Sequence, residues 1–207
     1  MTLVDRPDRR PTAVLMADLE GSTVLARRLS TAQYFAFGRR LVRAADQSII
    51  DRGGIVGRHA GDGVVAFFLA ETSGSESAAA RACIETARAI RTAITDIATR
   101  SGLEADDVSL RFGLHWGATL YVGRITTVGR SEVTALGDEV NETARIEACA
   151  TGGKTIASKV LIERLNTTDA QALEIDPDKT NYTPLGELAT ATDKARRDAP
   201  AIAVCNI

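Results

Sequence analysis

Two short acidic turns constrain this chain more than any other feature of its sequence. The first, Ala-Asp-Leu-Glu-Gly-Ser-Thr at residues 17–23, follows an apolar run, and the second, Ala-Gly-Asp-Gly-Val-Val at residues 60–65, leads into another. Each turn places one carboxylate, Asp18 or Asp62, at the end of an expected strand. Carboxylate oxygens are ligands that Mg²⁺ and Mn²⁺ prefer, and Mg²⁺ sites combine one or two carboxylates with substrate phosphates. The pair therefore predicts a divalent-metal site for nucleotide phosphate chemistry.

Composition narrows the class of protein. The chain has 207 residues, of which 44% are hydrophobic, so it can bury one substantial core, and we expect one domain preceded by a flexible tail at residues 1–11. With 25 basic against 27 acidic residues and only 4% aromatic residues, it lacks the basic field and the stacking surfaces typical of nucleic-acid binding. Nucleic acid is therefore not an expected partner.

The compartment follows from three absences in the sequence. The tail has no apolar signal segment, and the longest apolar run, residues 64–70, is far shorter than the roughly 20 residues that cross a bilayer. Cys83, Cys149 and Cys205 have neither disulfide-framework nor metal-ligand spacing. We expect a cytoplasmic protein without a membrane partner.

Apolar periodicity predicts strands that alternate with helices. The expected helices cover residues 31–51, 76–100 and 138–150, and the expected strands cover 12–17, 55–56, 64–69 and 108–116, with residues 120–125 returning beside the last of them and short signals continuing to residue 205. This order favours an α/β (α+β) fold with a ferredoxin-like core, in which helices flank a mixed, mostly antiparallel sheet.

Several candidate site residues also have an ordinary structural interpretation. An isolated Asp before Gly is most often a turn residue, and only the ordered pair Asp18 and Asp62 reverses that interpretation. Asn141 and Arg145 share one helix face because they lie four residues apart, and polar pairs at this spacing are commonly solvated. The surrounding sequence must therefore decide whether these residues have a site role or an ordinary structural one.

That context resembles the catalytic domain of the class III nucleotidyl cyclases, which make cyclic AMP or cyclic GMP from the nucleoside triphosphate. The likeness covers most of the chain and rests on residues 17–23, 53–63, 111–117 (Arg-Phe-Gly-Leu-His-Trp-Gly) and 135–147. It implies a cyclase catalytic domain at residues 12–207. It also implies a homodimer with composite active sites, in which one subunit supplies the metal ligands and the other the base and ribose contacts.

The resemblance assigns roles to residues that match the family's motifs. Asp18 and Asp62 become the ligands of two Mg²⁺ or Mn²⁺ ions per active site, with the backbone of Leu19 also close to the metals. Asn141 matches the asparagine that positions the ribose, and Arg145 matches the arginine that stabilises charge on the reacting phosphate.

The remaining assignments concern the base and the triphosphate. Thr134 falls where the family reads the base, usually with Asp but with Thr in one bacterial branch, and this favours adenine. Arg58 replaces the lysine that adenylyl cyclases usually carry; its planar fork is not interchangeable with a compact ammonium. Lys194 aligns loosely with a triphosphate-binding lysine, although the charged run at residues 193–198 is also typical of a solvated loop.

We therefore expect an adenylyl cyclase that converts ATP to 3′,5′-cyclic AMP and pyrophosphate, by metal-assisted attack of the ribose 3′-hydroxyl on the α-phosphate. Because Arg58 replaces the usual lysine, a guanylyl or unselective cyclase is the alternative within the family. A catalytically idle nucleotide-binding module and a metal phosphohydrolase that releases ADP or AMP are the alternatives from other classes.

Overall fold

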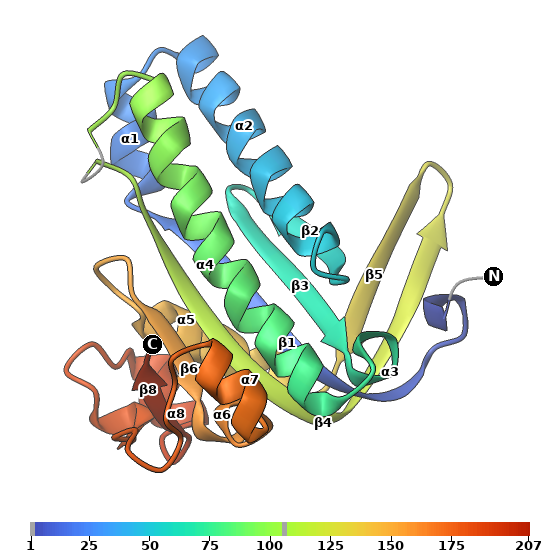
Figure 1. The fold of residues 1–207 in the computed structure, drawn as a ribbon. Coiled ribbons are helices and arrows are strands. Elements are labelled where there is room, and N and C mark those ends of the chain that lie inside the picture. Colours follow the sequence, from blue (N-terminus) through green and yellow to red (C-terminus); the bar gives the residue numbers. More distant parts are fainter. Residues whose placement is uncertain (1–2, 105–106) are drawn as a thin grey trace.

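The computed structural model describes residues 3–104 and 107–207, and the strands of these residues form one sheet (Figure 1). Its order is β2-β3-β1-β4-β6-β8-β7, and β5 pairs with β4 outside this path. All pairs are antiparallel except β4 with β6. The strands are β1 (Asp8–Glu20), β2 (Ile55–Ala60), β3 (Gly63–Leu69), β4 (Ser109–Thr127), β5 (Arg130–Leu136), β6 (Thr155–Ser158), β7 (Thr183–Pro184) and β8 (Ala203–Asn206). The mixed, mostly antiparallel sheet flanked by helices confirms the predicted fold class.

Two long helices, α2 and α4, lie side by side over one face of the sheet (Figure 1). Ser30 begins α2 with a capping box that includes Gln33, and the Ser75 side chain accepts a hydrogen bond from the Ala78 amide at the start of α4. The helices are α1 (Ser22–Arg28), α2 (Thr31–Ile50), α3 (Ala70–Ser73), α4 (Glu76–Arg100), α5 (Asp138–Cys149), α6 (Lys159–Ile162), α7 (Thr167–Ala172) and α8 (Asp193–Asp198), with 3₁₀ turns at Leu3–Asp5 and Leu185–Glu187. The three long helices predicted from periodicity are thus confirmed.

Alternate side chains of β1 serve two different cores, as the period of a strand requires. Ala13, Leu15 and Ala17 pack with α2 and α4 in the main core. Val14 points to the opposite face and joins a second cluster with residues of the β4–β5 hairpin. Asp18 has the same parity as Val14, so it faces away from α2 and α4.

The expectation of two strands at residues 108–116 and 120–125 was wrong, because β4 runs through both without turning back. The chain reverses only after β4, where Gly129 adopts a φ of 79°, and β5 returns from there. A β-bulge interrupts the pairing of β1 with β4, since Arg10 pairs with Leu120 but Thr12 pairs with Gly117. Beyond this bulge, β4 and β5 project from the sheet as a two-stranded arm (Figure 1).

The flexible tail expected at residues 1–11 also needs correction. A 3₁₀ turn covers Leu3–Asp5, and β1 begins at Asp8, which pairs with Val122 of β4. Arg10 is only 8% exposed and forms an ion pair with Glu71. Polar residues enter the sheet here because strand pairing uses the backbone, whatever the side chain. Residues 1–2 lie outside the described part.

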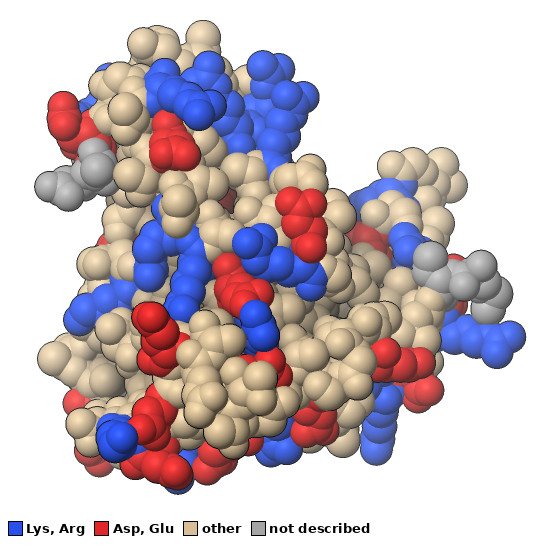
Figure 2. All heavy atoms as spheres, viewed as in Figure 1, with Lys and Arg blue, Asp and Glu red and all other residues tan. Residues whose placement is uncertain are grey.

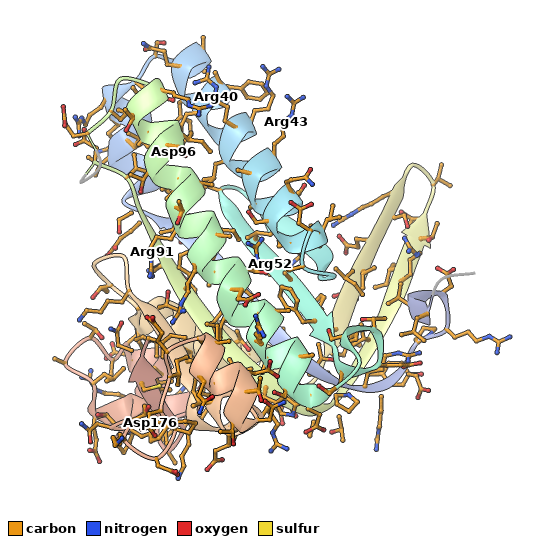
Figure 3. The ribbon with its side chains drawn as sticks, viewed as in Figure 1. Arg40, Arg43, Arg52, Arg91, Asp96 and Asp176 are labelled. Carbon is orange, nitrogen blue, oxygen red and sulfur yellow. The ribbon has the colours of Figure 1, made fainter. Side chains whose placement is uncertain are left out.

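The C-terminal third continues the sheet beyond β4 with β6, β8 and β7, and it contains α8 where the charged run predicted a loop. The Thr192 side chain caps α8 by accepting a hydrogen bond from the Ala195 amide. Arg91 of α4 connects this region to the long helices (Figure 3), because its guanidinium donates to the Gly153 carbonyl at 2.9 Å. All three cysteines are buried and free. Within residues 3–104 and 107–207, no helix is long and apolar enough to span a bilayer.

Candidate active site

The fold brings Asp18 and Asp62 together at one end of the central strands. Ala17 pairs with Val64, so Asp18 follows on β1 at the point where the β2–β3 turn carries Asp62. Gly61 adopts a φ of 67° in this turn, a conformation that favours glycine. Burial is the main cause that raises the pKa of Asp62, and the nearby charge of Asp18 raises it further. The two carboxylates therefore repel each other electrostatically.

This pair fits a divalent cation. The Oδ2 atom of Asp62 is buried and has no hydrogen-bond partner among the described residues, so it is an acceptor that a cation would satisfy. Across residues 3–104 and 107–207, no cluster of three or more His, Cys, Asp or Glu side chains could hold a metal ion. Two carboxylates suit Mg²⁺, which keeps several waters and takes substrate phosphates as further ligands.

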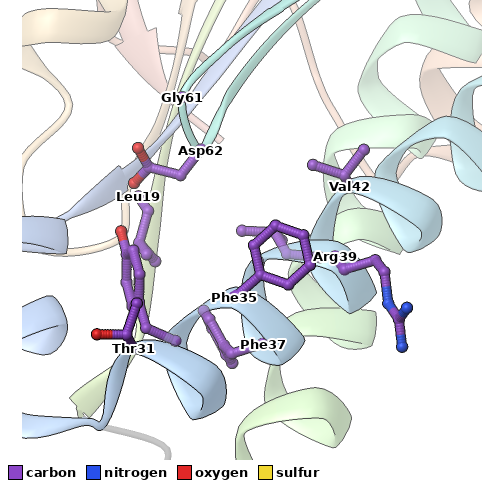
Figure 4. A pocket seen from close by; sticks show the side chains of 11 residues that line it. Leu19, Thr31, Phe35, Phe37, Arg39, Val42, Gly61 and Asp62 are labelled. Carbon is purple, nitrogen blue, oxygen red and sulfur yellow. The ribbon is translucent and has the colours of Figure 1, made fainter.

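Leu19 can contribute to such a site only through its backbone. Its side chain is 2% exposed and packs in the main core under α2. The same residue and Asp62 line an apolar cavity of about 460 Å³ along α2 (Figure 4). Phe35, which also lines this cavity, is 70% exposed. The end of the sheet that carries the two carboxylates thus adjoins an uncovered apolar surface.

Arg111 joins the carboxylate pair to α5, and sequence reasoning gave it no role. Its Nη2 atom donates to Asp18 Oδ2 at 2.7 Å, and its Nε atom forms an ion pair with Glu147 of α5. Burial raises the pKa of Glu147 to about 7; Arg111 opposes this rise and Asp18 adds to it. Arg111 and Glu147 both occur in the motifs at residues 111–117 and 135–147, but only the structure shows that they meet.

Helix α5 rests directly on β4 around Gly113. A Cβ atom on Gly113 would lie 2.4 Å from the Glu147 backbone nitrogen, so the helix approaches more closely than a side chain would allow. On the other side of Gly113, His115 Nε2 lies 2.9 Å from Glu142 Oε2. This contact and the Arg111–Glu147 ion pair fix where α5 presents its remaining side chains.

Those remaining side chains include Asn141 and Arg145, which line one cavity of about 360 Å³ with Asp138, Asp198 and other residues. Arg145 Nε donates to Asp198 Oδ2 of α8 at 3.0 Å. The structure therefore brings the predicted ribose and phosphate residues together. The Asp198 partner was missed because nothing in the sequence connects residues 53 positions apart.

The strands that carry the two predicted base-binding residues approach each other. Arg58 lies on β2 and Thr134 on β5, and a Cβ atom on Gly57 would be 3.3 Å from the Val133 carbonyl oxygen. Arg58 is exposed and Thr134 is half-buried. Lys194 is exposed on α8, and no hydrogen bond or ion pair among the described residues joins it to the other predicted site residues.

The candidate residues thus form three groups: the carboxylates Asp18 and Asp62, the cavity residues Asn141 and Arg145, and Arg58 and Thr134 on two strands that approach each other. No hydrogen bond or ion pair between described residues joins Asp18 or Asp62 directly to Thr134, Asn141 or Arg145. The described part of one chain therefore links the carboxylates to α5 through Arg111 and Glu147, and not directly to the predicted base, ribose and phosphate residues.

Comparison with known proteins gives consistent results. The family model of the adenylate and guanylate cyclase catalytic domain matches residues 5–183. An adenylate cyclase from Anabaena cylindrica is 22% identical over 169 residues, which are 80% of this chain and 33% of that protein. The chain therefore spans about a third of the length of this curated relative.

Two solved structures are similar over almost the whole chain. The adenylyl cyclase CyaB from P. aeruginosa has a TM-score of 0.73 and 19% identity, covering 97% of this chain and 95% of that one. The guanylyl cyclase Cya2 has a TM-score of 0.74 and 21% identity, covering 97% and 92%. At these identities the likeness shows the fold, and it is equally strong for an adenylyl and a guanylyl cyclase.

Proposed function

The chain belongs to the family of adenylate and guanylate cyclase catalytic domains, and from this we propose that it converts ATP to 3′,5′-cyclic AMP and pyrophosphate. The observation that carries the proposal is the pair Asp18 and Asp62, in which a buried Asp62 oxygen has no partner among the described residues. Such a pair has little structural use, because its mutual repulsion opposes folding, whereas two bound cations would neutralise it.

Asp18, Asp62 and the Leu19 backbone would hold two Mg²⁺ or Mn²⁺ ions. When bound, these ions activate the attacking 3′-oxygen and stabilise charge on the leaving pyrophosphate. The chain's own contribution is to keep the two carboxylates at one place, on adjacent strands whose register is fixed by six residue pairs. That rigidity is what a phosphoryl-transfer site requires, because positioning and electrostatics supply most of the catalysis.

Asn141 and Arg145 act on the other end of the substrate. Asn141 is exposed at the cavity, where its amide can orient the ribose so that the 3′-hydroxyl approaches the α-phosphorus; such orientation contributes up to about 7–11 kcal/mol. Arg145 presents a fork of donors suited to the oxygens of the reacting phosphate. Its ion pair with Asp198 keeps the guanidinium at this cavity in the absence of nucleotide.

We propose a homodimer in which each active site takes its carboxylates from one subunit and Asn141, Arg145 and the base contacts from the other. This arrangement is supported because, in the described part of one chain, no hydrogen bond or ion pair joins the carboxylates directly to those residues. Exposed apolar side chains give the subunits a surface to bury: Phe35 beside the carboxylates is 70% exposed, and on the arm Ile125 is 51% and Leu136 66% exposed.

ATP is the proposed substrate because Thr134 of β5 is the expected base-reading residue and Arg58 of β2 the expected cationic donor. The alternative is GTP or both nucleotides, since the arginine fork differs in reach from an ammonium. Separate incubation with ATP and GTP, with cyclic products measured by chromatography, distinguishes these cases. Lys194 stays a prediction for the triphosphate.

Mixing two inactive variants, Asp18→Ala and Arg145→Ala, tests the shared site. In a mixed dimer, one composite site carries both defects and the other carries neither, so activity absent from each parent should return to about a quarter of the wild-type value when dimers re-form at random. A mixture that exchanges subunits and remains inactive contradicts the shared site. A wild-type chain that binds ATP without forming any cyclic nucleotide is an idle binding module, and one that releases ADP or AMP is a hydrolase.

A further inference from the structure

We propose that Arg111, anchored by Glu147, is a positioning residue for the cation site. In this arrangement Arg111 holds one oxygen of Asp18 and leaves the other oxygen for the ion. The inference rests on the proposed function, because it concerns the same cations, but it assigns a task to two residues that the mechanism above does not use.

The contacts of Asp18 are asymmetric. Its Oδ2 atom accepts the 2.7 Å hydrogen bond from Arg111 Nη2. Its Oδ1 atom accepts no hydrogen bond from any residue in the described part of the chain. An aspartate held in this way cannot rotate freely about its terminal torsion, so its second oxygen keeps a fixed direction. Partners of this kind orient metal ligands and commonly set metal affinity.

Glu147 explains why Arg111 makes one contact with Asp18 instead of two. A guanidinium facing a single carboxylate usually donates along one edge with two parallel hydrogen bonds. Here the Nε atom faces Glu147 in an ion pair that lacks hydrogen-bond geometry, and Asp18 receives a hydrogen bond only from Nη2. The Glu147 side chain is 13% exposed and the Arg111 side chain is 27% exposed, which limits competition from water. Without Glu147, Arg111 would be free to engage both oxygens of Asp18.

Only an arginine can bridge the two carboxylates in this geometry. Its Nε and Nη2 donors are fixed side by side on one edge of a planar group, so each can face a different carboxylate, whereas a lysine ammonium is a single point of charge on a flexible stem. Arg111→Lys therefore keeps the charge on β4 but removes the bridge. Glu147→Gln removes the ionic anchor and keeps the shape of the side chain.

The test is the affinity of the full-length protein for Mn²⁺, measured from the electron paramagnetic resonance signal of the free ion. The titration is made with 3′-deoxy-ATP present, because this nucleotide lacks the attacking hydroxyl and no turnover occurs. We expect the Kd for Mn²⁺ to rise about ten- to hundredfold in Arg111→Lys and about tenfold in Glu147→Gln, the range typical when a hydrogen-bond partner of a metal ligand is lost. The double variant should bind Mn²⁺ no more weakly than Arg111→Lys alone, because the two residues act as one unit.

Glu142→Gln is the matched control. It removes a carboxylate from the same helix and breaks the other contact with β4, the one to His115, but it does not touch Arg111. We expect its Kd for Mn²⁺ to stay within twofold of the wild-type value. Thermal melting of each variant establishes that the protein is folded, and Glu147→Gln decides alone if Arg111→Lys does not fold.

The outcomes separate the two proposals. Variants that bind Mn²⁺ as tightly as the wild type, or more tightly because Arg111 merely repels the ion, overturn the positioning role and leave the cyclase proposal intact. An equal loss in Glu142→Gln also overturns it, since any weakening of the helix contact would then suffice. A wild-type protein that binds no Mn²⁺ overturns both.

Discussion

Gly113 of β4 lies directly beneath Glu147 of α5, so close that a Cβ atom at Gly113 would stand 2.4 Å from the Glu147 backbone nitrogen. The atom in the way belongs to the helix backbone and cannot rotate aside as a side chain would. The helix that presents Asn141 and Arg145 can therefore pack this closely on β4 only because residue 113 has no Cβ atom.

Gly113→Ala should displace α5 and lower the free energy of unfolding by about 1–3 kcal/mol, the usual cost of overpacking a tightly packed site. Urea denaturation followed by circular dichroism measures this change. Gly38→Ala is the control: nothing lies within 4 Å of the added Cβ at that position in α2, so alanine should stabilise the helix by up to about 1 kcal/mol. Equal effects at the two glycines would contradict the close seating of α5.

Asp62→Asn should lower the cyclase activity and raise the thermal stability of the metal-free protein. Cyclic AMP formation with Mn²⁺ should fall at least about a hundredfold, because a lost metal ligand removes several kcal/mol of transition-state stabilisation. The raised pKa of Asp62 means that its ionised form opposes folding near neutral pH. The neutral amide should therefore raise the melting temperature in metal-free buffer. Asp96→Asn, on the exposed side of α4 (Figure 3), should change neither quantity.

Glu147 makes stability depend on pH in a defined window. Its pKa is raised from 4.5 to about 7 in the folded protein, so the folded state binds more protons than the unfolded state between these values. The free energy of unfolding must then fall as pH rises from about 4.5 to about 7. We expect this one group to contribute on the order of 2 kcal/mol.

Chemical denaturation of the metal-free protein at pH 5 and pH 7.5 measures this contribution as the difference between wild type and Glu147→Gln. The glutamine variant does not titrate at this position, so its stability should decline less over the same interval. Identical pH dependence in the two proteins would show that Glu147 is ionised throughout.

Arg58→Lys tests base recognition. If Arg58 reaches the base from β2, a compact ammonium should raise the ratio of kcat/KM for ATP over GTP by about tenfold, or about 1.4 kcal/mol. Steady-state rates with each nucleotide give this ratio. Arg43→Lys, an exposed arginine on α2 (Figure 3), should leave it unchanged. A constant ratio in Arg58→Lys would place Arg58 outside the base pocket.

Charge on the visible face is unevenly distributed, and this bears on the choice of control residues. Lys and Arg side chains gather over α2 at the top of the view (Figure 2). This helix carries Arg39, Arg40 and Arg43. All three are exposed. A charge-conserving change there alters neither the overall charge nor the packing of the core, which makes Arg43 a suitable reference for Arg58.

Much of the fold follows from local sequence. Helices α2 and α4 were predicted to within a residue because their apolar faces repeat every three or four residues. The β2–β3 hairpin followed from the two glycines around Asp62. The course of β4 did not follow, because its bulge leaves two successive exposed residues, Ala118 and Thr119, and interrupts the alternation that identifies a strand.

The contacts of the candidate site likewise include some that local sequence predicts and some that it does not. The meeting of Asp18 and Asp62 was predictable, since both lie at ends of strands expected to be neighbours. The bridge from Asp18 through Arg111 to Glu147 was not, because it depends on how closely a helix approaches a strand across the sheet. The pairing of Arg145 with Asp198 depends on α8, whose charged residues predicted a loop.

The bulge in β4 limits which insertions and deletions the β4–β5 arm can accept. Side chains of a strand change face at every residue, so the extra residue opposite Arg10 and Thr12 decides which way every later side chain of the arm points. Deleting or inserting one residue at the bulge would reverse the face to which position 123 and its cross-strand partner Thr134 are directed. Arg111, which precedes the bulge, would keep its orientation. Changes of length between the carboxylate end and the arm should therefore be tolerated in steps of two residues and rejected in steps of one.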